Sequence, residues 1–74
     1  MASKARRGKA RAIINIIDRL EREAGQPAPK PLVMEEAERM GIGRDEAEAI
    51  MALLLREEGS RLFQPKPGHY SILR

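Results

Sequence analysis

The last sixteen residues constrain the fold of this 74-residue chain more than any other segment. They hold its two aromatic residues, Phe63 and Tyr70, one on each side of a Pro-Lys-Pro-Gly sequence. Residues 66–69 fit a type II turn, because proline fixes φ at the second position and glycine accepts the positive φ of the third. The short apolar runs 62–63 and 70–73 on either side predict two antiparallel strands. The chain is therefore expected to end in a β-hairpin, called the wing below (residues 59–74).

Apolar residues at helical spacing predict a first helix, which ends at Gly25. A proline-rich linker, residues 26–31, follows it, because three prolines lack a backbone donor and restrict the residues before them. Pro31 suits the first turn of a second, short helix that runs to Met40. The inward residues of these two helices are expected to be Ile13, Ile16, Ile17, Leu20 and Ala24, and Val33, Ala37 and Met40.

A third helix is predicted over residues 44–58. Asp45 and Glu46 in its first turn suit the positive end of the helix dipole. Ile42, in the Gly-Ile-Gly turn before it, is expected to fill the core between the helices. The inward stripe of the third helix comprises Ala47, Ile50, Met51 and Leu54.

The order of these elements predicts a mainly α domain with a small β-hairpin, a winged helix-turn-helix of three helices plus a wing. Residues 1–9 are expected to form a basic flexible tail or linker, and residues 10–74 the winged-helix domain. The alternative is a three-helix bundle with a disordered tail, which would not need aromatic and β-branched residues around a Pro-Gly turn. The wing residues expected to cover the open side of the core are Leu62, Phe63, Tyr70 and Ile72.

Composition excludes several classes of function. Seventy-four residues make one small core and leave no room for an enzyme of ordinary size, so no catalytic residue is expected. The chain has no cysteine and a single histidine, His69, so neither a metal site nor a cofactor is expected. No apolar run reaches membrane-spanning length, and the N-terminus lacks the apolar centre of a signal peptide. We expect a cytoplasmic domain with no membrane contact.

The net charge of +3 is unevenly distributed. Residues 1–17 carry a net charge of +5, residues 18–58 carry −5, and residues 59–74 carry +3. The basic character therefore lies at the two ends of the chain and not in its helical middle, which matters because affinity for nucleic acid depends on where the positive charge lies. The basic tail is interpreted as a linker, with a non-specific DNA-binding arm as the alternative. Its cations are Lys4, Arg6, Arg7, Lys9 and Arg11.

The outward positions of the third helix favour a protein contact. In a DNA-binding helix-turn-helix this helix enters the major groove, where it needs cations for the flanking phosphates. Here carboxylates outnumber cations, and small side chains permit close approach of a partner. Leu53 and Leu55 either widen this face or, more simply, pack under the wing, and the carboxylates of the second and third helices are expected to be solvated. The candidate protein-contact residues are Asp45, Glu48, Ala49, Ala52 and Arg56.

The wing is the better candidate for contact with DNA. Arg61, Lys66 and His69, together with Arg74, place positive charge on a protruding hairpin. Such a hairpin can meet backbone phosphates without reading bases. The alternative is an ordinary solvated turn.

The C-terminal half of the chain resembles the winged-helix domain at the C-terminus of archaeal MCM (minichromosome maintenance) replicative helicases. The first helix and the linker are similar in kind only, and Gly43 and one extra residue after Gly59 depart from the family pattern. The first departure weakens a helix cap, and the second puts the register of the wing in doubt by one residue. The matching residues are Gly41-Ile42, residues 45–48, Leu54-Leu55-Arg56, Gly59 and, above all, residues 62–70.

The resemblance implies a non-enzymatic accessory domain, monomeric in isolation and nucleoid-associated, that modulates the motor activity of a DNA replication helicase. Its partners would be the motor domain of the parent helicase or replication initiation factors, with at most weak non-specific DNA binding. One alternative is a free-standing winged-helix DNA-binding transcription regulator. Another is a dimerisation module that uses the face around Ala49 and Ala52.

Overall fold

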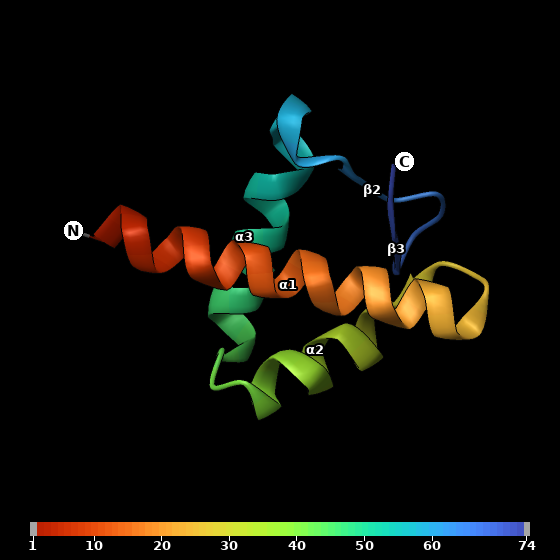
Figure 1. Ribbon diagram of the computed structural model, residues 1–74, viewed down its shortest axis with the longest axis horizontal. Coiled ribbons are helices and arrows are strands. Elements are labelled where there is room, and N and C mark those ends of the chain that lie inside the picture. Colours follow the sequence, from red (N-terminus) through yellow and green to blue (C-terminus); the bar gives the residue numbers. More distant parts are fainter. Residues whose placement is uncertain (1, 74) are drawn as a thin grey trace.

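The computed structural model describes the backbone of residues 2–73 and the side chains of residues 8–57 and 59–73. The fold is mainly helical with a small antiparallel sheet, as expected for a winged helix. The elements are α1 (Ala2–Ala24), β1 (Ala28–Pro29), α2 (Lys30–Arg39), α3 (Arg44–Arg56), the 3₁₀ helix η1 (Glu58–Ser60), β2 (Leu62–Phe63) and β3 (His69–Ile72). In Figure 1, α1 runs across α3, α2 lies along one side of α1, and the strands lie beside the C-terminal half of α1.

One core joins the three helices and the sheet. The predicted inward stripe of α3 is confirmed in full, and Ile42 fills the space between helices as expected. Leu20 and Ile72 pack against the core from its margin, and Ala24 is exposed at the end of α1. The buried apolar residues are Ile13, Ile16, Ile17, Ala28, Val33, Met34, Ala37, Ile42, Ala47, Ile50, Met51, Leu54, Leu62 and Tyr70.

Besides Ala24, two other residues predicted to be inward are exposed. Met40 is 59% exposed, because α2 ends at Arg39 and the chain leaves the helical path at Met40. Met34, which was not predicted, takes its place in the core at 7% exposure. Phe63 is 40% exposed, because successive residues of a strand point to opposite faces and the preceding Leu62 points inward.

The proline-rich segment predicted as a linker contributes a third strand. The strand order is β1-β3-β2, so β3 is the central strand and both pairings are antiparallel. Ala28 pairs with Tyr70, and the Lys30 amide, one residue past β1, donates to the Gly68 carbonyl at 2.8 Å. Prolines are compatible with β1 because it is an edge strand and one side of it needs no backbone donors. The linker therefore fixes the wing to the start of α2.

The predicted turn at the tip of the wing is present. Gly68 has a φ of +76°, and the His69 amide donates to the Lys66 carbonyl at 3.2 Å. This is the i to i+3 hydrogen bond of a β-turn with glycine at the position of positive φ. At the base of the wing, the Leu73 amide donates to the Arg61 carbonyl at 2.7 Å.

Glu21 of α1 completes the central strand where β1 is too short to reach. Its Oε1 accepts a hydrogen bond from the Ile72 amide at 3.2 Å, and its Oε2 accepts one from the Ser71 hydroxyl. Ser71 is only 6% exposed, so its hydroxyl depends on this partner. The Glu21 carboxylate thus adds a polar attachment to the apolar packing between α1 and the wing.

The first helix is longer than predicted, and the third is shorter. α1 extends back to Ala2 through the segment expected to be a flexible tail, whereas α3 ends at Arg56. The division into a linker (residues 1–9) and a domain (residues 10–74) stays a prediction. The side chains of Lys4, Arg6 and Arg7 lie outside the described ones, as does Arg74. No helix within residues 2–73 has the length and apolar character needed to cross a membrane.

Candidate functional site

The face of α3 predicted to make protein contacts lies in solvent along its whole length. Leu53 extends this face with an apolar side chain that is 46% exposed, whereas Leu55 is half-buried against the core. One of the two leucines therefore packs inward, as the simpler interpretation required, and the other widens the exposed face. The predicted residues Asp45, Glu48, Ala49, Ala52 and Arg56 are all exposed.

Two carboxylates of α3 are held by lysines from other elements. Glu48 Oε1 lies 2.6 Å from Lys30 Nζ at the start of α2, and Glu46 Oε2 lies 2.7 Å from Lys9 Nζ on α1. The carboxylates of α3 were expected to be merely solvated, but these two are engaged in ion pairs. Lys9, one cation of the predicted basic tail, is likewise not available as a free charge.

The Lys30–Glu48 pair shifts the pKa of each partner in the direction that favours its charged form. The hydrogen bond to Glu48 is the main cause that raises the pKa of Lys30, and the same hydrogen bond lowers the pKa of Glu48. Arg44, at the start of α3, adds a positive charge close enough to lower the pKa of Glu48 further and to oppose the shift of Lys30. Both partners are about half exposed, so water and salt screen the attraction.

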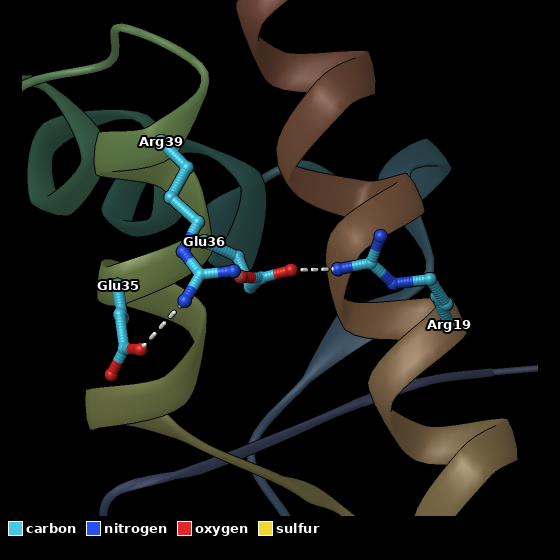
Figure 2. Close-up of polar contacts among 4 residues, drawn as sticks. All are labelled: Arg19, Glu35, Glu36 and Arg39. Atoms are coloured by element: carbon cyan, nitrogen blue, oxygen red, sulfur yellow. Dashed lines mark hydrogen bonds and ion pairs between the residues drawn. The ribbon is translucent and has the colours of Figure 1, made fainter.

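The carboxylates of α2 are also engaged, in this case with arginines. Figure 2 shows Glu36 of α2 between Arg19 of α1 and Arg39 of its own helix. Arg39 Nη1 lies 3.4 Å from Glu36 Oε2, and Arg39 Nη2 lies 3.5 Å from Glu35 Oε1. This chain of charges joins α1 to α2, and we assign it a structural role.

The cations that remain unpaired lie mostly on the wing and on α3. Within the described side chains, the ion pairs closer than 4 Å include none of Arg11, Arg44, Arg56, Arg61 and Lys66. Lys66 is exposed in the turn at the tip of the wing, and Arg61 is exposed at its base in a left-handed conformation with a φ of 65°. The predicted wing cations therefore do not form one cluster.

His69 belongs to the tip of the wing but is less available than Lys66. Its ring is half-buried, and Nδ1 lies 3.1 Å from the carbonyl oxygen of Pro67 in the same turn. Of the three predicted DNA contacts on the wing, Lys66 is the most exposed charge at the tip. Among the described side chains, no group of three or more histidines or carboxylates is placed to hold a metal ion.

Sequence reasoning missed an apolar surface at the base of the wing. Phe63 (40% exposed) and Leu73 (61% exposed) line a shallow pocket with Leu55, bordered by Glu57 and Arg61. The signal for this surface was in the sequence: in the pair Leu62-Phe63, only one side chain can point into the core. A partner protein that covered this surface would bury two large apolar side chains.

No family model, no curated protein and no solved structure matches this chain. The fold is therefore assigned from the structure alone. The resemblance to the archaeal MCM winged-helix domain stays a prediction that rests on the residues named above, chiefly residues 62–70.

Proposed function

We propose that this chain is a non-enzymatic accessory winged-helix domain that acts through protein contacts and touches DNA only weakly, by way of backbone phosphates. The observation that carries the proposal is the charge on the outward face of α3. The helix that would enter a major groove presents Asp45 and Glu48, and the lysine nearest to Glu48 is already held by that carboxylate. A groove-binding helix needs free cations for the phosphates on both sides of the groove, and α3 offers two, Arg44 and Arg56, against the carboxylates of Asp45, Glu46 and Glu48.

The protein contact uses two exposed surfaces. The first is the outward face of α3, where Ala49 and Ala52 allow close approach and Leu53 supplies apolar area. The second is the apolar surface around Phe63 and Leu73 at the base of the wing. Exposed apolar side chains with a polar border are typical of protein interfaces.

On the resemblance named above, the partner is the ATPase motor of an archaeal MCM helicase, and the domain modulates ATP hydrolysis and unwinding. Support for this assignment comes from the segment 62–70, which carries most of the resemblance and forms the first strand, the turn and half of the second strand of the wing. Replication initiation factors are the second class of partner.

The DNA-binding part of the proposal is tested by titrating labelled duplexes of several sequences at two salt concentrations. We expect weak binding that does not depend on sequence. If about three phosphates are contacted, raising the salt from about 50 to about 200 mM weakens binding by about 40-fold. Submicromolar, sequence-dependent binding at physiological salt would instead identify a free-standing transcription regulator.

The protein-contact part is tested with an archaeal MCM hexamer that lacks its own C-terminal winged-helix domain. We expect addition of the chain to change the rate of ATP hydrolysis, and the variants Leu53→Asp and Phe63→Ser to weaken that effect. Wild-type chain without any effect on ATPase or unwinding contradicts the assignment. Sedimentation of the isolated chain is a further check: a dimer disrupted by Ala49→Arg would support a dimerisation module in place of the accessory role.

A further inference from the structure

Glu48 lies among positive charges that come from different elements. Its carboxylate is 2.6 Å from the ammonium of Lys30 at the start of α2, and Arg44 precedes it by one helical turn on α3. Lys30, Arg44 and Glu48 line the same shallow groove between the two helices. The electrostatic influence of Arg44 on both partners of the ion pair agrees with this proximity.

The backbone of the wing turn is fixed to the first residue of α2. The Lys30 amide donates to the Gly68 carbonyl at 2.8 Å, and Gly68 belongs to the turn that carries Lys66. Backbone hydrogen bonds thus hold the wing turn beside the first residue of α2. Lys30 is paired with Glu48, whereas neither Arg44 nor Lys66 forms an ion pair with a carboxylate among the described side chains.

We propose that Glu48 is a specificity-determining residue that blocks a latent phosphate-binding surface formed by Lys30 and Arg44, beside the wing turn that carries Lys66. The ligand of that surface is the backbone of double-stranded nucleic acid. A phosphate that approaches Lys30 must displace the Glu48 carboxylate and then remain beside it, so attraction by the ammonium is offset by repulsion. The inference rests on the proposed function, because it supplies the reason why this winged helix binds DNA only weakly.

The rest of the groove limits how strong the unblocked surface can be. Glu35 and Glu38 line it as well, on the α2 side, and Glu35 is shared with Arg39. Removal of Glu48 alone therefore adds about one phosphate contact. It does not create a sequence-reading interface.

The test compares Glu48→Gln with Glu46→Gln, which is a closely matched control. Both substitutions remove one carboxylate of α3, both free a lysine held at 2.6–2.7 Å, and both raise the net charge by one. They differ in location, because Lys9 lies on α1 and Lys30 lies beside the wing. Binding to a labelled duplex of arbitrary sequence is measured by fluorescence anisotropy at several salt concentrations.

We expect Glu48→Gln to tighten binding about tenfold near 50 mM salt and to steepen the salt dependence by about one phosphate contact. Glu46→Gln is expected to change affinity by less than about twofold, since it adds no contact to the surface. The double variant Lys30→Ala/Glu48→Gln should return to the wild-type affinity. Glu48→Ala serves as a second variant if the glutamine variant does not fold.

Three outcomes overturn the inference: no gain from either Glu48 variant, an equal gain from Glu46→Gln, or a gain that survives loss of Lys30. Each is distinguishable from failure of the proposed function. Tight, sequence-dependent binding by the wild-type chain contradicts the proposed function. Weak wild-type binding with an unchanged Glu48→Gln variant contradicts only the role of Glu48.

Discussion

The outward face of α3 and the wing are both rich in charge, but they use it differently. On α3, the carboxylates of Glu46 and Glu48 are each neutralised by a lysine from another helix, whereas Arg44 and Arg56 form no ion pair among the described side chains. On the wing, Arg61 and Lys66 are exposed and unpaired among the described side chains. Whether a charged side chain is free to bind a partner is therefore decided by its tertiary neighbours, and not by the number of acids and bases along the sequence.

The wing can hold these cations in place only if it packs firmly on the core. Two adjacent residues of β2, one buried and one exposed, test which side chain provides that packing. We expect Leu62→Ala to destabilise the domain by about 3 kcal/mol, because it leaves a cavity under the wing. Phe63→Ala, one residue later and 40% exposed, should cost less than about 1 kcal/mol. Urea unfolding measures both. Equal losses would mean that the two side chains are not on opposite faces of β2.

The anchoring carboxylate on α1 gives the next largest effect. Glu21→Ala removes the acceptor of the Ile72 amide and the Ser71 hydroxyl, so we expect a loss of about 2 kcal/mol. Glu23→Ala, an exposed change two residues along the same helix, is the control and should stay within about 0.5 kcal/mol of wild type. Thermal unfolding followed by circular dichroism distinguishes them, and similar midpoints for the two variants would refute the anchor.

The turn that carries Lys66 should tolerate little change at Gly68. A methyl group there meets no atom within 4 Å, but the φ of +76° strains any residue with a Cβ. We expect Gly68→Ala to cost about 1–2 kcal/mol. Gly59→Ala meets equally open space without a positive φ, so it should be nearly neutral. If both variants unfold at the same urea concentration, the turn does not depend on a left-handed residue.

The smallest effect is the pH dependence of the Lys30–Glu48 pair, which joins α2 to α3. The pKa of Glu48 is lowered in the folded state, so its contribution to stability is present above its unfolded pKa and is lost as the pH falls through the folded value. The pKa of Lys30 is raised, so its contribution is lost only as the pH rises through that higher value. We expect the stability difference between wild type and Glu48→Gln to be greater at neutral pH than at acidic pH. A difference independent of pH would show that the pair is not formed in solution.

The sequence predicted those parts of the molecule that depend on neighbours along the chain. The stripe of α3 from Ala47 to Leu54 and the positive φ of Gly68 follow from helical spacing and turn chemistry. Met40 was wrongly predicted to be inward because α2 ends one residue before it, at Arg39, and Met34, which was not predicted, is buried instead.

The packing of Leu62 and Tyr70 on the core was predicted, but specific pairings between distant residues were not. β1 has only two residues, and it is a strand because it pairs with Tyr70 and His69. The pairs Lys9–Glu46 and Lys30–Glu48 join different helices, and no local pattern indicates which acid meets which base. The sequence therefore indicated which residues form the candidate surfaces, whereas only the structure shows which of their charged side chains are held in ion pairs.

The central position of β3 has a consequence for how the chain folds. β3 is the partner of both other strands, and Glu21 meets it from 50 residues away. The α2–α3 pair can form from local contacts, but the sheet requires closure of a long loop, which is slow. We expect the helical pair to form early and the sheet to complete the domain last. An incomplete chain that stopped before β3 would then retain helices but leave β1 and β2 without partners.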